Sequence, residues 1–171
     1  MPGDRRWYLV QAKTGLETRA RAHLERQQFE VFLPTILRTV RHARRSETKK
    51  VPLFPGYLFV ALDLHEDHWG AVSNTVGVIR LVIADGRPLP VPRGIVECLL
   101  ERDTDKGLDL AKGNLVAGSK VRVLSGPFAD QLAHVERMAG PERVRILLDL
   151  MGNHVPIEVE VPHLLPIAPA R

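Results

Sequence analysis

The sequence predicts an α+β fold in two parts, an antiparallel-sheet domain with flanking helices that is linked to a small β-barrel. One observation is an amphipathic helical period, Leu16, Ala20 and Leu24, placed between two strand-like segments. Another is the apolar run 57–62, which suits a central strand that is buried on both faces. The third is a change of sequence pattern after residue 115, where short segments rich in strand-forming apolar residues are separated by turn residues.

The bulk composition is that of an ordinary globular protein. Of the 171 residues, 44% are hydrophobic and 26% charged, which argues against wholesale disorder. No apolar run approaches the roughly 18 residues that a membrane-spanning helix needs, and the N-terminus does not resemble a secretion signal. The single cysteine, Cys98, excludes an internal disulfide framework. We therefore expect a soluble, cytoplasmic monomer.

The first domain is expected over residues 5–102 and opens with a strand, a helix and a second strand. Trp7–Ala12 is rich in strand-forming residues. Thr14 and Glu17 have the spacing of a helix capping box, which predicts a helix over about 15–28. The stretch Phe29–Leu33, just before Pro34, is expected to form the next strand.

The middle of this domain alternates between a charged and an apolar segment. Arg38–Lys50 holds six Lys or Arg residues against one Glu, and predicts a basic hairpin tip or a mobile loop. Tyr57–Leu62 follows a stretch with two prolines and a glycine, and predicts the central strand. Trp69 and Val72 indicate a second helix that ends near Asn74.

The end of this domain is expected to hold one more strand and a third helix. Val78–Ile83 predicts the strand, and Asp85-Gly86 provides a turn. Pro92 suits the first turn of the helix. The stripe that this helix is expected to bury comprises Ile95, Val96, Leu99 and Leu100, with Cys98 core-facing or inert in the same helix.

The second part begins after a linker expected at residues 103–115 and is predicted to form a barrel over 116–168. The linker mixes charges with two glycines and shows no period. Turn residues such as Ser125-Gly126-Pro127 separate the expected barrel strands. These strands are Val121–Val123, His134–Val135, Val144–Leu150 and Val155–Val161.

Charge is distributed unevenly along the chain. Residues 1–50 carry 12 Lys or Arg against 5 Asp or Glu, whereas residues 51–171 carry 12 against 15. This asymmetry is typical of a protein in which one face meets a polyanion. A solvated basic surface without a partner explains the same numbers, and charge alone does not decide between the two.

Several stretches resemble the NusG superfamily of transcription elongation factors and together cover nearly the whole chain. WYLVQAKTGLETRARAHLERQ, PLFPGYLFV and HWGAVSNTVGVIRLV are similar to successive segments of the NusG N-terminal domain. GSKVRVLSGPFAD resembles a KOW motif, the signature of an SH3-like barrel. The segment HLERQ, the short connection after the first helix and the compact chain look closer to the specialised RfaH-like branch.

The resemblance implies a binding function with RNA polymerase as the partner. In this family the N-terminal domain packs an apolar patch on the clamp helices of the β′ subunit and reaches the gate loop of the β subunit. By motif position, Tyr57 and Phe59 are the candidates for the clamp-helix patch, and Phe54 and Leu53 are expected in the same groove. His68 matches one residue of the gate-loop motif of the RfaH branch. Aromatic residues in a strand are also common core residues, so the core reading stays open.

The resemblance also implies contacts with the non-template DNA strand. Lys13 and His23 match the basic face that binds this strand in RfaH. Arg41, Arg44 and Arg45 are further candidates for phosphate contact, or belong to a solvated loop tip.

The barrel is expected to recruit a second partner. By resemblance this is a small-subunit ribosomal protein, or the termination factor Rho in housekeeping NusG. Leu150 and Met151 match the contact region, although barrel core is an equal reading for Leu150.

Two positions depart from the family pattern. Ala133 replaces the glycine usual near the end of the KOW motif, which is tolerated unless the backbone there needs a positive φ. Val51 replaces the glutamate that helps RfaH hold its C-terminal domain as an α-hairpin. We therefore expect a β-barrel without autoinhibition.

No catalytic residue, cofactor or metal is expected. His65 and His68 are only three residues apart, but no third ligand motif accompanies them.

The sequence leaves two alternative functions open. One is a general NusG that links polymerase to Rho or the ribosome. The other is a KOW-type ribosome- or RNA-binding protein, although residues 103–171 carry 8 basic against 9 acidic residues, which argues against direct RNA binding.

Overall fold

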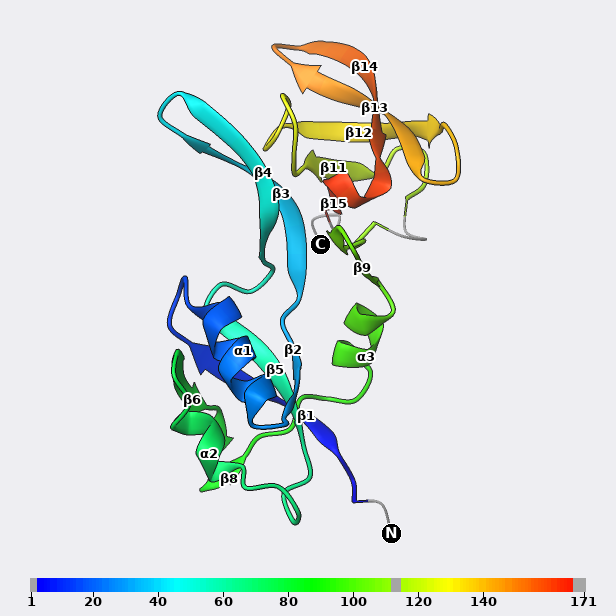
Figure 1. The fold of residues 1–171 in the computed structure, drawn as a ribbon. Helices are drawn as coiled ribbons and strands as arrows, with labels where there is room; N and C mark the ends of the chain where they lie inside the picture. Colours follow the sequence, from blue (N-terminus) through cyan, green and yellow to red (C-terminus); the bar gives the residue numbers. More distant parts are fainter. Residues whose placement is uncertain (1–2, 112–114, 168–171) are drawn as a thin grey trace. The chain divides into compact units, whose positions relative to one another are not determined.

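A computed structural model describes residues 3–111 and 115–167 of the chain (Figure 1). The chain separates into two compact units. The first comprises Met1–Thr35 and Pro52–Glu101, and the second comprises Ile36–Val51 and Arg102–Arg171. In the described ranges, no helix has the length and apolar character needed to cross a membrane.

The first unit contains a four-stranded antiparallel sheet in the order β2-β5-β1-β6. Its strands are β1 (Arg6–Ala12), β2 (Glu30–Phe32), β5 (Tyr57–Leu62) and β6 (Val78–Leu81). The prediction of a central strand is confirmed, because β5 pairs with β1 on one side and with β2 on the other.

Two helices cover one face of this sheet. Ala20 and Leu24 of α1 (Glu17–Arg26) and Val72 of α2 (Gly70–Ser73) are fully buried. They pack with the strand residues that point to the same side, which include Tyr8, Val10, Ala12, Leu58, Val60 and Leu62. The predicted amphipathic helix is thus confirmed, and its apolar stripe forms the core of this unit.

Two expectations about helices are wrong in detail. Helix α1 begins after Leu16 without a side-chain cap, and Glu17 bonds the backbone of Gly56 in place of Thr14, so no capping box forms. In α3 (Ile95–Leu100) only Val96 is buried. The other expected stripe residues are not buried, and Cys98 is exposed. A helix of six residues has too few turns to bury a continuous stripe.

The first unit is completed by a short hairpin, β7 (Ile83–Ala84) and β8 (Arg87–Pro88), which is closed by the predicted Asp85-Gly86 turn. This hairpin leads into a proline-containing segment and then into α3.

The second unit is built around a five-stranded antiparallel sheet in the order β14-β13-β12-β11-β15. The strands are β11 (Lys120–Val123), β12 (Leu132–Met138), β13 (Arg143–Leu150), β14 (Asn153–Glu160) and β15 (Leu164–Pro166), with the 3-10 helix η1 (Val161–His163) before the last. Side chains from all five strands share one apolar core, as a small barrel requires. The α+β fold class is confirmed.

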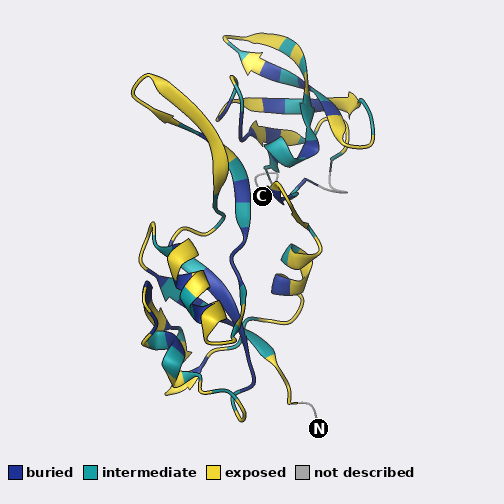
Figure 2. Ribbon diagram, in the orientation of Figure 1, coloured by how far each residue is buried: buried dark blue, intermediate teal, exposed yellow. Residues whose placement is uncertain are grey.

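The basic segment forms a hairpin, β3 (Thr35–His42) and β4 (Arg45–Pro52), and its outer part is exposed (Figure 2). Its base joins the second unit. The Thr39 amide donates to the carbonyl of Leu124 (3.0 Å), and the Gly126 amide donates to Thr39 Oγ1 (2.8 Å). The sequence predicted this segment within the first domain, residues 5–102, whereas Ile36–Val51 belongs to the second unit.

The expected linker also has structure of its own. It contains a hairpin, β9 (Asp103–Thr104) and β10 (Gly107–Leu108), and both Leu108 and Ala111 are buried. Three residues of the expected linker, 112–114, lie outside the described residues. Ala133 occupies a buried position within strand β12, where a positive φ is not needed and alanine fits.

Candidate functional site

Side chains of the central strand β5 alternate between the two faces of the first sheet. Leu58, Val60 and Leu62 are fully buried in the core that the helices cover. Tyr57 and Phe59 project from the opposite face, as expected for strand residues one position away. This second face carries the candidate site.

A row of aromatic side chains crosses this face. Phe59 is paired in register with Phe32 of β2 on one side and with Leu9 of β1 on the other. The rings of Phe32 and Phe59 are stacked with centroids 6.4 Å apart, and Phe54 meets Phe59 edge-on at 6.3 Å. Trp7 meets Phe32 edge-on at 6.5 Å. These distances lie in the range of favourable aromatic pairs, so the row forms an apolar floor, and its members Phe54 and Phe59 line the groove described next.

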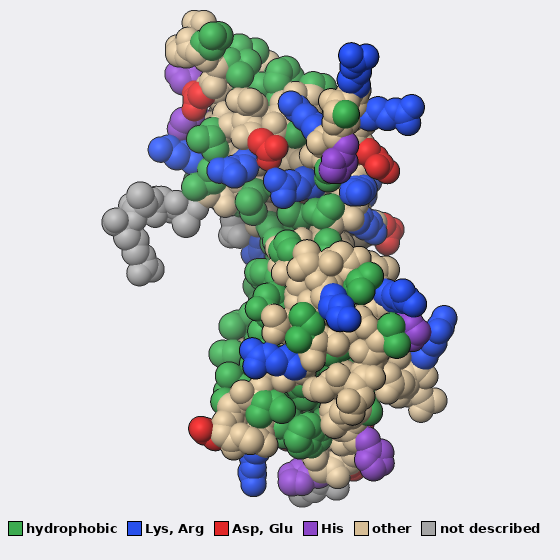
Figure 3. Space-filling view, turned by 90° about the vertical axis from the view of Figure 1, so that its left-hand side faces the viewer, with side chains coloured by type: hydrophobic (Ala, Val, Ile, Leu, Met, Phe, Trp, Pro, Cys, Tyr) green, Lys and Arg blue, Asp and Glu red, His purple; other side chains and the backbone are tan. Residues whose placement is uncertain are grey.

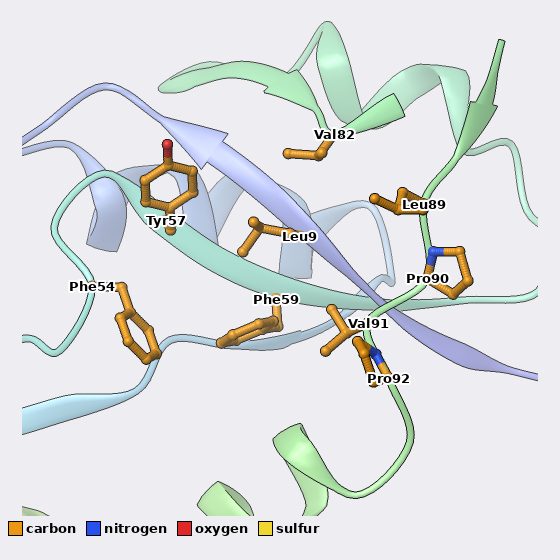
Figure 4. Close-up of a pocket in the computed structure, with 9 residues that line it drawn as sticks. All are labelled: Leu9, Phe54, Tyr57, Phe59, Val82, Leu89, Pro90, Val91 and Pro92. Atoms are coloured by element: carbon orange, nitrogen blue, oxygen red, sulfur yellow. The ribbon is translucent and has the colours of Figure 1, made fainter. Parts of the chain in front are cut away.

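An apolar groove of about 440 Å³ lies over this floor (Figure 4). None of its nine lining residues is charged. They are Leu9, Phe54, Tyr57, Phe59, Val82, Leu89, Pro90, Val91 and Pro92. A groove of this composition suits an apolar protein surface better than a charged ligand or substrate.

One wall of the groove is the segment Leu89–Pro92, which we call the proline segment. Its backbone is fastened to strand β1 of the sheet, because the Val91 amide donates to the carbonyl of Trp7 (2.8 Å). The Leu89 amide donates to the carbonyl of Val82 (3.1 Å), which lies between β6 and β7. Its two prolines, Pro90 and Pro92, have no amide to donate, so the segment cannot continue the sheet as a regular strand. It remains a fixed wall.

The groove has a buried floor and an exposed rim. Phe59 is only 5% exposed, whereas Phe54 and Leu89 are 42% and 52% exposed. Exposed apolar residues gathered around a hollow mark an interaction surface, whereas single exposed ones are ordinary. The core reading of the strand aromatics therefore applies to the buried Phe59 more than to Tyr57, which is half-buried.

The structure brings together three of the residues that the sequence assigned to this patch, Phe54, Tyr57 and Phe59. Leu53 is half-buried beside the groove but does not line it. Its amide donates to the carbonyl of Pro34 (2.8 Å), which fixes the chain before the Phe54 turn. His68 is exposed in the loop before α2 and also lies outside the lining.

The basic candidates fall into two sets, one in each unit. Lys13 is exposed and its amide donates to the carbonyl of Gly77 (2.9 Å), while His23 is half-buried on α1. Figure 3 shows one face of the molecule, on which blue Lys and Arg side chains are more widespread than red Asp and Glu.

The arginine candidates of the second unit lie on the β3–β4 hairpin and are exposed. Arg41 donates to the carbonyl of Pro127 (3.0 Å), so part of its donor capacity is used within the unit. Arg44 lies in the turn of the hairpin, after Ala43 with φ +52°, and Arg45 begins β4. These two guanidinium groups stand at the hairpin tip.

At the tip of the β13–β14 hairpin the barrel presents a fully exposed apolar side chain. Met151 is fully exposed with φ +49° and is followed by Gly152 with φ +81°. Leu150 differs, because it is half-buried and packs against the barrel core. Beside this tip, the Asp149 carboxylate lies 2.8 Å from His154 Nδ1 and 3.3 Å from His134 Nδ1.

Comparison with known proteins places these features in a family. The family model described as "Transcription termination factor nusG" matches residues 5–100, more than half of the chain. The chain belongs to the NusG family. It is 33% identical to the transcription termination/antitermination protein NusG of Thermus thermophilus over 90% of this chain and 94% of that protein. It is 31% identical to NusG of Staphylococcus aureus strain Mu50, over 92% and 93% of the two chains.

Solved structures that resemble this NusG-family chain include one of Thermotoga maritima NusG. It is 20% identical, covers 96% of this chain and 98% of that chain, and has a TM-score of 0.41. An MjSpt4:Spt5 complex is 18% identical, with coverage of 96% and 99% and a TM-score of 0.32.

Sequence reasoning missed the proline segment as part of the NusG-family groove. The signal was present, since PLPVP places apolar side chains between prolines, where neither a helix nor an inner strand is allowed. Its pairing with Trp7 is a long-range contact that no local pattern encodes.

Proposed function

We propose that this chain is a transcription elongation factor that binds RNA polymerase through the apolar groove of its first unit. The observation that carries this proposal is the uncharged groove with its exposed rim, within the segment that the NusG family model matches. The curated relatives are named as termination/antitermination proteins.

The occupant of the groove is proposed to be the pair of clamp helices of the β′ subunit. A helix that lays an apolar stripe into a hydrophobic groove is a common mode of recognition. A factor that binds the closed clamp better than the open one shifts the population toward the closed state, and each difference of about 1.4 kcal/mol changes the ratio tenfold. Pausing and termination then become less frequent without any catalytic group. A contact of His68 with the β gate loop remains a prediction.

Two further contacts complete the proposal. Lys13, His23 and the hairpin arginines would contact phosphates of the non-template DNA strand, which gives affinity without base selection. Met151, at the tip of the β13–β14 hairpin, would be the barrel contact for a small-subunit ribosomal protein or Rho. For Leu150 the proposal is narrower: it supports the tip from the core side.

The test of the polymerase contact is a binding titration with purified bacterial core RNA polymerase. Because Phe59 is buried, its replacement would also change folding, and the rim residues give a cleaner variant. We expect Phe54→Ser combined with Leu89→Ser to weaken binding by about tenfold or more, as loss of interface anchors does. The matched control is Val76→Ser with Ile79→Ser, which alters two equally exposed apolar residues of the same unit outside the groove. Equal affinity of both variants would contradict the proposal.

Within this function we propose a specialised, operon-directed role in preference to a general one, on the basis of the segment HLERQ and the short connection after the first helix. Mapping chromosomal occupancy by sequencing separates the two. Enrichment at a few long operons supports the specialised role, and uniform coverage of transcribed genes supports a general one.

A further inference from the structure

Helix α1 carries a buried carboxylate whose partner lies on another element. Glu17 is 4% exposed, and its Oε1 accepts a hydrogen bond from the Gly56 amide at 2.8 Å. A glutamate is rarely buried to this extent, because removing its charge from water is costly unless donors replace the lost hydration. The position of Glu17 is therefore not explained by helix formation alone.

The partner of Glu17 is the middle of a tight turn. The Tyr57 amide donates to the carbonyl of Phe54 (3.0 Å), Pro55 holds the second position, and Gly56 holds the third with φ +82°. These features define a type II turn. The turn's own hydrogen bond does not use the Gly56 amide, which then needs an acceptor from elsewhere.

Both sides of Gly56 are fastened to the body of the first unit. Its amide is held by Glu17 of α1, and its carbonyl accepts from the Ala12 amide at the end of β1 (2.8 Å). The turn is thus clamped between the first helix and the first strand.

The residues at the two ends of this turn line the apolar groove. Phe54 forms part of the exposed rim, and Tyr57 begins the strand that provides the floor (Figure 4). A shift of the Gly56 peptide would move both side chains together, because they are the first and fourth residues of the same turn. Glu17 thus contacts the turn that carries two lining residues, although it does not line the groove itself.

We propose that Glu17 is a positioning residue for polymerase binding, which acts by holding the Phe54–Tyr57 turn through the Gly56 amide. This inference rests on the proposed function of the groove. It assigns to Glu17 a role other than the helix cap that its spacing from Thr14 suggests.

The test compares three full-length variants, Glu17→Ala, Glu17→Gln and Glu25→Ala. Glutamine keeps an acceptor oxygen at the same place, whereas alanine removes it. Glu25 is the matched control, because it lies on the same helix and is exposed, with an ion pair to Arg21. The readouts are hydrogen exchange of the Gly56 amide by NMR, exchange of the β5 amides, and affinity for core RNA polymerase.

In Glu17→Ala we expect the Gly56 amide to exchange about tenfold faster or more while the Val60 amide in the central strand keeps its protection. Polymerase affinity should fall by about tenfold. Glu17→Gln should restore most of both, and Glu25→Ala should change neither.

Two results would overturn the proposal. One is unchanged Gly56 exchange and unchanged affinity in Glu17→Ala. The other is a uniform loss of protection across the β5 amides, which would make Glu17 a residue of general stability. If the unmodified chain fails to bind polymerase, the proposed function fails, while Gly56 exchange still decides whether Glu17 holds the turn.

Discussion

Among the apolar residues, the exposed fraction of the side chain separates those that can bind a partner from those that stabilise the fold. The apolar side chains of Phe54, Leu89 and Met151 are exposed. Phe59 lies five residues after Phe54, and Leu148 lies three residues before Met151, and both are buried. Substitution of an exposed residue should alter binding alone, whereas substitution of a buried residue should alter the free energy of unfolding as well.

A pair of substitutions in the barrel shows this difference. Leu148→Ala should lower the free energy of unfolding by about 2–5 kcal/mol, because Leu148 is fully buried and alanine leaves a cavity. Met151→Ala should change it by less than about 0.5 kcal/mol, because Met151 is fully exposed. Urea unfolding followed by circular dichroism measures both, and a large loss in Met151→Ala would contradict its placement.

His163 gives the barrel a pH dependence. Burial lowers the pKa of the His163 imidazole below its ordinary value, Glu160 opposes this and Lys106 adds to it. The imidazole Nδ1 is hydrogen-bonded to Ser125 Oγ. The unfolded chain therefore binds a proton at higher pH than the folded chain, so stability is complete above about pH 6.5 and is lost as pH falls toward the lowered pKa.

The prediction is a smaller loss in a variant that cannot titrate. Between pH 7.5 and pH 5.5, the free energy of unfolding should fall more in the unmodified chain than in His163→Gln, in which the amide can still bond Ser125. Identical falls in the two chains would show that other groups cause the pH dependence.

At the level of elements, the β3–β4 hairpin is strongly basic, with five Lys or Arg against one Glu over residues 41–50, all of them exposed. If it binds DNA phosphates, each arginine that contacts a phosphate adds about 0.9 to the slope of log affinity against log salt. The combined variant Arg41→Ala, Arg44→Ala and Arg45→Ala should lower this slope by up to about 3 for duplex DNA.

This prediction is measured by fluorescence anisotropy with a labelled duplex at several salt concentrations. Arg143→Ala is the control, because Arg143 is an exposed arginine of the barrel. An unchanged slope in the triple variant would mean that the hairpin arginines form a solvated loop tip.

The elements that the sequence predicts well are those whose apolar pattern is strong and local. Tyr57–Leu62 forms β5, and the period of Ala20 and Leu24 forms the buried stripe of α1. Strand β15 and the β9–β10 hairpin escaped prediction, because they are two or three residues long and carry little pattern of their own.

Only those parts of the candidate site that follow from a local sequence pattern were predicted. The alternation around Leu58 places Tyr57 and Phe59 on one face, and this is confirmed. The proline segment and the role of Glu17 depend on pairing between residues far apart in sequence, so no local period encodes them. The capping-box spacing even pointed Glu17 to the wrong partner, because the exposed Thr14 backbone has water available and the buried Gly56 amide does not.

At the scale of the whole molecule, we propose that the two units carry different binding functions. The first unit carries the groove and the second carries the hairpin and the barrel tip. The groove and the barrel tip are each formed by residues of one unit, so we expect groove variants to affect polymerase binding and Met151 variants to affect recruitment, independently of each other. Additive effects of combined variants on the two affinities would support this division.

The most direct measurement of the central claim is a site-specific photocrosslink from the groove. A photoreactive amino acid in place of Phe54 should crosslink to the paired helices of the largest polymerase subunit, as mapped by mass spectrometry, and the same group at Ile79 should not. Crosslinks from position 54 to other regions only, or equal crosslinking from both positions, would contradict the claim that this groove holds the polymerase.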